Sequence, residues 1–149
     1  MQKAVLKRLL VEQKEEGCPN DLIARELAVH PRRKKANTLV GIRRAGKTYS
    51  MFQIMDDLNT GNVFYINLED ERLIHPNLQH LTRLIPTIRE TFELEEGPIY
   101  LFVDEIQNVP EWEQWARRIA EKPDVYLFIS GSSSKVTSEE VATELRGRT

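Results

Sequence analysis

A glycine-rich segment, GIRRAGKT, carries the residue types that bind phosphate. It runs from Gly41 to Thr48 and matches the pattern G-x-x-x-x-G-K-[ST] at every fixed position. Gly41 and Gly46 let backbone amides surround phosphate oxygens without a Cβ in the way, and the unpaired N–H groups that open the next helix attract anions. In this pattern Lys47 reaches the β- and γ-phosphates, and the Thr48 hydroxyl is placed on Mg²⁺. The segment therefore predicts a Walker A loop that binds ATP.

The alternative is a chance match, which is expected in roughly one unrelated chain of this length in two hundred. The surroundings favour phosphate binding, because an apolar strand over 38–40 precedes the loop and an amphipathic helix over 47–58 follows it. Arg43 and Arg44 either help with phosphate charge, face a partner subunit, or form a solvated loop edge. The residues expected at the nucleotide are Gly41, Arg43, Arg44, Ala45, Gly46, Lys47, Thr48 and Tyr49.

Two acidic residues, Asp104 and Glu105, directly follow the apolar run 99–103. Ligands of open α/β sheets bind at the carboxyl ends of the strands, so both acids would lie at the ligand edge. Asp104 is expected to hold Mg²⁺ through water, and Glu105 to polarise the water that attacks the γ-phosphate. Two acids in an ordinary strand-exit turn would look the same on their own. The Walker A loop elsewhere in the chain favours a Walker B site.

Other P-loop classes lack support in the sequence. There is no Asn-Lys-x-Asp guanine reader and no Ser-Gly-Gly signature of the ABC class, and small-molecule kinases rarely need a Glu directly after the magnesium Asp. The remaining class is the ATPases with a catalytic Glu, which have an extra strand between the two Walker strands. The apolar run 125–129 fits that strand. Ser130 after it is expected to touch the γ-phosphate or the attacking water, with Ser132 behind it; a Ser/Gly loop without chemistry is the alternative.

The predicted site residues must be positioned by regular secondary structure. Along the chain, segments with the hydrophobic pattern of helices alternate with apolar segments typical of strands. The expected elements are helices over 2–16, 21–29, 47–58, 77–94 and 110–122, and strands over 38–40, 63–68, 99–103 and 125–129. Alternating helices with strands that are apolar throughout predict an α/β fold with a parallel sheet covered on both faces. Pro86 is expected at a helix start or at a kink, which would divide the helix over 77–94 into two pieces. We expect N-terminal helices and a connector over 1–36 and a P-loop core over 37–149.

The composition is that of an ordinary globular domain. Of the 149 residues, 40% are hydrophobic and 30% are charged, and no apolar run has the ~18 residues of a membrane span. Cys18 is the only cysteine, so no intrachain disulfide can form, and a cytoplasmic location is expected. The net charge of −2 gives no general attraction to nucleic acid. The basic run 32–35 leaves nucleic acid open as a partner, although a solvated connector is the simpler interpretation. Trp112 and Trp115 are expected to pack in the core or an interface.

Several segments in a fixed order resemble one family. GIRRAGKT, LFVDEIQNVPEWEQWARRI, FISGSSS and ELRGR are similar to prokaryotic AAA-type ATPases that carry a C-terminal domain of unknown function. The resemblance covers roughly residues 20–149 and implies a three-layer core with strand order 5-1-4-3-2. It implies that Ser130 is a sensor residue and that Arg148, or Arg146, contacts the γ-phosphate. It also implies a fifth strand and a large second domain after Thr149, so the chain is expected to be the ATPase part of a longer protein.

The function expected from these features is a Mg²⁺-dependent ATPase domain. ATP binding and hydrolysis would move the missing C-terminal domain or a partner. One alternative is a nucleotide-gated interaction module with little hydrolysis, and another is a phosphotransferase to a small molecule, for which no acceptor site is recognisable. The expected partners are ATP or ADP, the missing domain and further copies of the chain, with no membrane. The sequence leaves open what the ATPase acts on.

Overall fold

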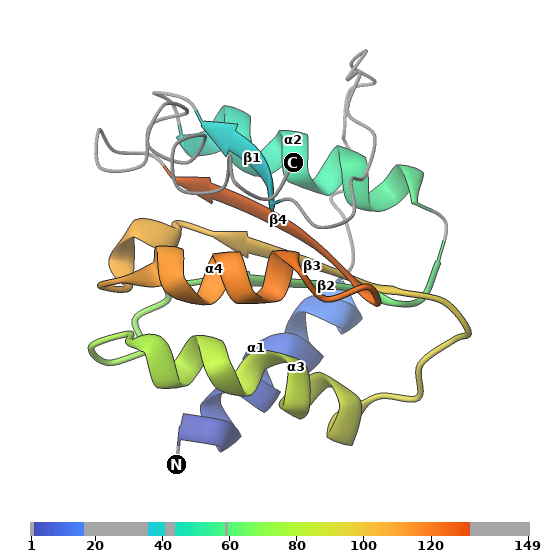
Figure 1. Ribbon diagram of the computed structural model, residues 1–149, viewed down its shortest axis with the longest axis horizontal. Coiled ribbons are helices and arrows are strands. Elements are labelled where there is room, and N and C mark those ends of the chain that lie inside the picture. Colours follow the sequence, from blue (N-terminus) through green and yellow to red (C-terminus); the bar gives the residue numbers. More distant parts are fainter. Residues whose placement is uncertain (1, 17–35, 41–43, 59, 132–149) are drawn as a thin grey trace.

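A computed structural model of the chain describes residues 2–16, 36–40, 44–58 and 60–131 (Figure 1). For Gln2, 36–40 and 44–50 the backbone alone is described. In chain order the elements are α1 (Gln2–Glu16), β1 (Ala36–Val40), α2 (Arg44–Asp57), β2 (Val63–Asn67), α3 (Leu78–Thr91), β3 (Ile99–Asp104), the 3₁₀ helix η1 (Ile106–Asn108), α4 (Trp112–Ala120) and β4 (Val125–Gly131). The predicted second helix over 21–29 lies outside the described residues.

The described strands form one four-stranded sheet in the order β1-β4-β3-β2. All three pairings are parallel, which confirms the predicted sheet and its order 1-4-3-2. The expected fifth strand would fall outside the described residues. In the register Leu39 lies beside Ser130, and Asn67 lies beside Asp104. The carboxyl ends of all four strands therefore meet along one edge of the sheet.

The two faces of the sheet are covered by different helices, as Figure 1 shows. Alternate strand residues, among them Phe64, Leu101 and Leu127, pack in one core with α1, α3 and α4. The opposite face packs against α2 and includes Tyr65 and Phe102. This alternation is the period of two expected for strands buried on both faces. The result is the predicted three-layer α/β arrangement.

Helix α3 is continuous, so the predicted break at Pro86 is wrong. Pro86 is exposed, whereas Leu84 and Ile88 on the core-facing side of the helix are fully buried. A proline inside a helix removes one hydrogen bond and costs about 3 kcal/mol. Burial of the apolar stripe offsets that cost, since each fully buried large apolar side chain contributes about 1.5–3 kcal/mol.

Three boundaries near the predicted site differ from expectation. Helix α2 begins at Arg44, three residues before the predicted start at Lys47. Strand β4 continues through Ser130 to Gly131, because β1 pairs with it from Leu127 to Gly131. Helix α4 begins at Trp112 and not at Pro110, because Glu111 has a left-handed backbone with φ 62° and cannot continue a helix from Pro110.

Helix α1 packs onto the outer strand of the sheet. Leu6 and Leu10 are buried in the same core as α3 and β2. Lys14 Nζ donates hydrogen bonds to the carbonyl oxygens of Gly61 (2.7 Å) and Val63 (3.0 Å) at the start of β2. Burial lowers the pKa of the Lys14 ammonium group. Lys14 of α1 thus satisfies carbonyl groups at the sheet edge, where a strand typically presents unpaired backbone groups. The predicted division of the chain at residue 36 stays a prediction.

Candidate active site

Asp104 is the last residue of β3 and the centre of a buried polar network. It is 1% exposed and points to the α2 face of the sheet, as Phe102 does two residues earlier. Oδ2 accepts a hydrogen bond from the Tyr65 hydroxyl (2.7 Å), and Oδ1 accepts from the Ser130 hydroxyl and from the Glu105 backbone N–H (3.0 Å). Tyr65 belongs to β2 and Ser130 to β4, the two neighbours of β3. Donors from both sides therefore fix the orientation of this carboxylate.

The chemistry of this carboxylate fits Mg²⁺. Magnesium is held by one or two carboxylates together with substrate phosphates and several waters, and it prefers oxygen ligands. Among the described residues, no group of three or more His, Cys, Asp or Glu side chains could hold a metal alone. A magnesium ion held mostly by phosphate and water needs no such group. Asp104 would supply the carboxylate, and the ion would neutralise charge on the phosphates.

Glu105 turns the chain out of the sheet in a left-handed conformation, with φ 58° and ψ 48°. Its backbone carbonyl accepts hydrogen bonds from the Asn108 backbone N–H (3.2 Å) and side-chain Nδ2 (2.9 Å). Its side chain is fully buried, and Oε2 accepts from Gln107 Nε2 (2.7 Å). A residue other than glycine pays about 1–2 kcal/mol for this backbone, and such positions cluster at functional sites. The 3₁₀ helix η1 therefore holds the acid in place.

Ser130 is fully buried inside β4 and not in a loop after the strand. Its hydroxyl donates to Asp104, so the structure joins it to the acid that the sequence predicts to hold Mg²⁺. Its predicted contact with the γ-phosphate or the attacking water stays a prediction. Ser132, expected behind it, lies outside the described residues.

Tyr65 and Gln107 are site residues that the sequence analysis missed. Tyr65 lies in β2 opposite Phe102, and its ring packs on Phe52 of α2 with centroids 4.9 Å apart. The available signal was a tyrosine within an apolar strand, two residues before the strand end. For Gln107 the signal was an amide two residues after the second acid.

The Walker A segment connects β1 to α2. Gly41 and Arg43 lie outside the described residues, as does Arg148. The backbone of the other predicted nucleotide contacts forms the start of α2; they are Arg44, Ala45, Gly46, Lys47, Thr48 and Tyr49. The roles of their side chains stay predictions. The strand before the loop ends with Val40 beside Gly131, one residue after Ser130. The loop therefore leaves the sheet next to the Asp104 network.

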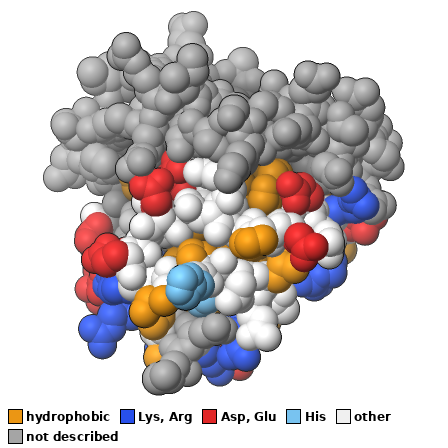
Figure 2. Space-filling view, turned by 90° about the vertical axis from the view of Figure 1, so that its left-hand side faces the viewer, with side chains coloured by type: hydrophobic (Ala, Val, Ile, Leu, Met, Phe, Trp, Pro, Cys, Tyr) orange, Lys and Arg blue, Asp and Glu red, His pale blue; other side chains and the backbone are white. Residues whose placement is uncertain are grey.

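Figure 2 views the molecule from the side on which the arrowheads of β1, β3 and β4 lie in Figure 1. On the described surface in this view, acidic and basic side chains alternate with hydrophobic ones. This mixture gives no reason to prefer nucleic acid among the expected partners. No helix in the described ranges is long and apolar enough to cross a membrane.

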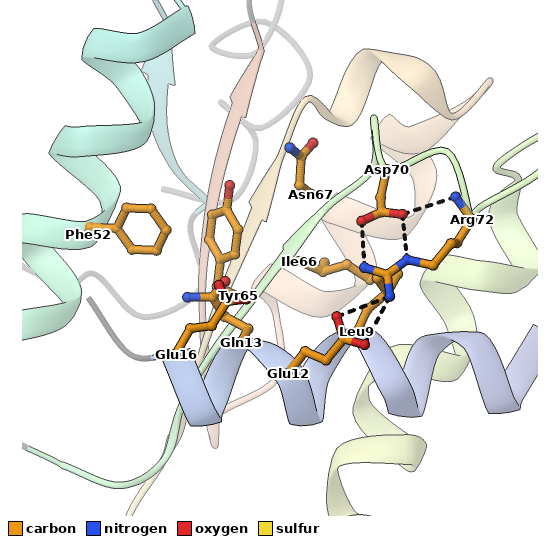
Figure 3. A pocket seen from close by; sticks show the side chains of 10 residues that line it. All are labelled: Leu9, Glu12, Gln13, Glu16, Phe52, Tyr65, Ile66, Asn67, Asp70 and Arg72. Atoms are coloured by element: carbon orange, nitrogen blue, oxygen red, sulfur yellow. Dashed lines mark hydrogen bonds and ion pairs between the residues drawn. The ribbon is translucent and has the colours of Figure 1, made fainter. Parts of the chain in front are cut away.

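A cavity of about 310 Å³ lies beside the network, between α1, α2 and β2 (Figure 3). Tyr65 and Phe52 form part of its wall. At its other end Arg72 donates to both carboxylate oxygens of Glu12 (3.0 Å each) and to Asp70 (2.9 and 3.0 Å). The hydrogen bonds from Arg72 lower the pKa of Asp70. The cavity thus borders the Asp104 network on one side and an ion-pair cluster on the other.

Comparisons with known proteins identify the family. A family model described as "AAA domain" matches residues 33–149. An uncharacterised protein of Methanocaldococcus jannaschii is 36% identical over 149 residues, which is 98% of this chain and 32% of that protein. An uncharacterised protein of Haemophilus influenzae is 31% identical over 114 residues, which is 72% of this chain and 28% of that protein. The chain thus spans about a third of the length of these relatives.

Among solved structures, that of C. elegans PCH-2 matches with a TM-score of 0.49 and 12% identity, over 95% of this chain and 39% of that one. The family model covers most of the sequence, including the segment Gly41 to Thr48, the acids Asp104 and Glu105, and Ser130. The chain therefore belongs to the AAA domain family and is an AAA-type P-loop ATPase module.

Proposed function

We propose that this chain binds ATP with Mg²⁺ at the carboxyl edge of its sheet and hydrolyses it. The observation that carries the proposal is the network at Asp104. Its carboxylate lies at the end of β3, is held by Ser130 from β4, and adjoins the point where β1 leads into the Walker A segment. A P-loop ATPase needs its magnesium carboxylate and its phosphate loop at the same edge of the sheet.

Each residue has a separate part in the proposed reaction. Lys47 and the amides around Gly46 bind phosphate oxygens, while Thr48 and Asp104 hold Mg²⁺. When bound, the ion would neutralise charge that develops on the phosphates. Glu105 accepts a proton from the attacking water, and Ser130 and Arg148 respond to the γ-phosphate. The proposed location is the cytoplasm.

The chain is about a third as long as its relatives, so the proposed output is movement of the rest of a longer protein or of a partner. A second function, an interaction module that binds ATP and hydrolyses it slowly, is supported by one observation. The Glu105 carboxylate is buried and already accepts a hydrogen bond from Gln107. In that arrangement the Glu105 carboxylate is hydrogen-bonded to a residue of the turn that follows it, and this contact competes with a contact to water. Turnover decides between the two functions.

The test is thermal unfolding of the full chain with and without MgATP, beside the variant Lys47→Ala. Ligand at 100 times Kd stabilises the folded state by about 2.7 kcal/mol. For a domain of this size that corresponds to a rise in Tm of roughly 5–10 °C. We expect the rise in the wild type and not in the variant. Equal rises in both, or none in the wild type, would contradict the proposed site.

A further inference from the structure

We infer that Tyr65 is a positioning residue that sets the magnesium affinity of the site through Asp104. The inference rests on the proposed function and deepens it. Tyr65 is not part of either Walker motif. It lies on β2, which pairs with β3 on the side away from β4 and β1. The Tyr65 hydroxyl donates to Asp104 Oδ2 at 2.7 Å in a buried environment.

The geometry explains why a tyrosine is needed at this position. In the register Asn67, and not Tyr65, lies beside Asp104. The Asn67 side-chain oxygen accepts instead from the Glu69 backbone N–H (2.8 Å), which holds that amide in the turn after β2. Tyr65 lies beside Phe102, two residues earlier, and only a long side chain spans that diagonal. A phenylalanine would fill the apolar layer equally well, so the hydroxyl is the distinguishing feature.

The ring that carries this hydroxyl is fixed from the other side. Phe52 of α2 packs on the Tyr65 ring at an interplanar angle of 37°, and Figure 3 shows the two rings side by side in the cavity wall. Helix α2 is the helix that begins within the Walker A segment. Tyr65 therefore joins the helix of the phosphate loop to the carboxylate of the Walker B strand.

Ser130 and Tyr65 approach the carboxylate from opposite strands and act on different oxygens. With both in place, rotation of the carboxylate plane is restricted. Without the Tyr65 hydroxyl, Oδ2 loses that restraint while the Ser130 contact remains. Residues that orient a metal ligand in this way typically change metal affinity or activity by roughly 10–100-fold when removed.

The test uses the full chain and a fluorescent ADP analogue, with Tyr65→Phe as the variant. Analogue affinity is measured first in EDTA and then during a Mg²⁺ titration. We expect Tyr65→Phe to match the wild type in EDTA and to need roughly 10–100-fold more Mg²⁺ for the half-maximal change. Tyr126→Phe is the matched control, because Tyr126 packs in the same layer against α2 and is stacked on Tyr100. Asp104→Asn serves as the reference, because it shows the Mg²⁺ response of a site that has lost its proposed magnesium carboxylate.

The outcomes distinguish a failure of the inference about Tyr65 from a failure of the proposed ATPase function. A wild type that responds to Mg²⁺ and a Tyr65→Phe variant with the same response overturn the inference and leave the proposed function intact. The inference is also overturned if Tyr65→Phe lowers the unfolding temperature and leaves the Mg²⁺ response unchanged, because the hydroxyl would then have a structural role alone. A wild type that binds no analogue with or without Mg²⁺ overturns both. A shifted Mg²⁺ response in Tyr65→Phe alone, with Tyr126→Phe unchanged, supports the inference.

Discussion

Asn62 and Asp104 are both 1% exposed, yet they lie at opposite ends of the sheet and are satisfied in different ways. Asn62 is a neutral amide at the amino end of β2. Its Nδ2 donates to the carbonyl oxygens of Glu95 (2.8 Å) and Pro98 (3.2 Å), and its Oδ1 accepts from the Glu95 backbone N–H (2.7 Å). Every one of these partners is backbone from the single connection between α3 and β3.

Asp104, by contrast, is an acid held largely by side-chain hydroxyls from two other strands. Backbone partners suit a group whose task is to close a loop, because they are present whatever side chains the loop carries. Hydroxyl partners orient a carboxylate without neutralising it, so it can still meet a cation. Burial alone therefore does not distinguish a structural polar group from a candidate site residue. The charge of the group and the source of its hydrogen-bond partners distinguish Asp104 from Asn62.

The largest effect is expected at the carboxyl end, from Glu105→Gln. A general base contributes roughly 10²–10⁴-fold to rate, so ATP turnover should fall by that factor while ATP binding is retained. Turnover and analogue affinity are measured on the same preparation. Glu111→Gln is the matched control, because Glu111 is exposed and has the same left-handed backbone. Turnover that survives Glu105→Gln would break the proposed mechanism.

The next effect is expected at the amino end, where Asn62→Ala removes a fully satisfied amide. The backbone groups of Glu95 and Pro98 then lose three part-buried hydrogen bonds, a loss that costs about 1–3 kcal/mol in total. We expect the free energy of unfolding in urea to fall by that amount. Nucleotide affinity and its Mg²⁺ dependence should not change under conditions where the variant is folded. A weaker Mg²⁺ response in this variant would show that the two ends are not separate.

The smallest effect is expected from His80, a third buried polar group. His80 Nδ1 accepts from the Asn77 backbone N–H (3.1 Å) in the cap that opens α3, which requires a neutral ring nitrogen. Burial, and then the nearby positive charge of Arg83, lower the pKa of His80 below 6.5. The unfolded chain therefore binds the proton more readily, and stability present above about pH 6.5 is lost as the pH falls through the folded pKa.

Urea unfolding between pH 8 and pH 5 measures this loss, which we expect to stay within the ~1 kcal/mol of a helix cap. His80→Gln keeps an acceptor without the titration and should flatten the pH dependence. His75→Gln, at an exposed histidine, should leave it unchanged. A pH dependence that persists in His80→Gln would assign the effect to other groups.

Much of the fold could be predicted from local patterns. The helix over 2–16 has the predicted bounds, and Trp112 and Trp115 are buried in the core as expected. The strand order came from the ATPase class that the motifs indicate and from the family resemblance, because periodicity says that strands exist and not which ones are neighbours. The predicted break at Pro86 failed for a related reason. A local rule cannot weigh one lost hydrogen bond against the burial of Leu84 and Ile88.

The Walker A pattern, the acids Asp104 and Glu105, and the parallel α/β class can be read from the amino-acid sequence, because each depends on residue types at short spacing. The meeting of Tyr65 and Ser130 at Asp104 cannot be read from it and depends on how the strands are arranged in the sheet. Tyr65 and Ser130 lie 39 and 26 residues from Asp104 along the chain. Contacts of that separation exist only after the order β1-β4-β3-β2 places three strand ends side by side. The same holds for Asn62 and the Glu95 backbone, 33 residues apart, whose pairing depends on how the connection after α3 packs against β2.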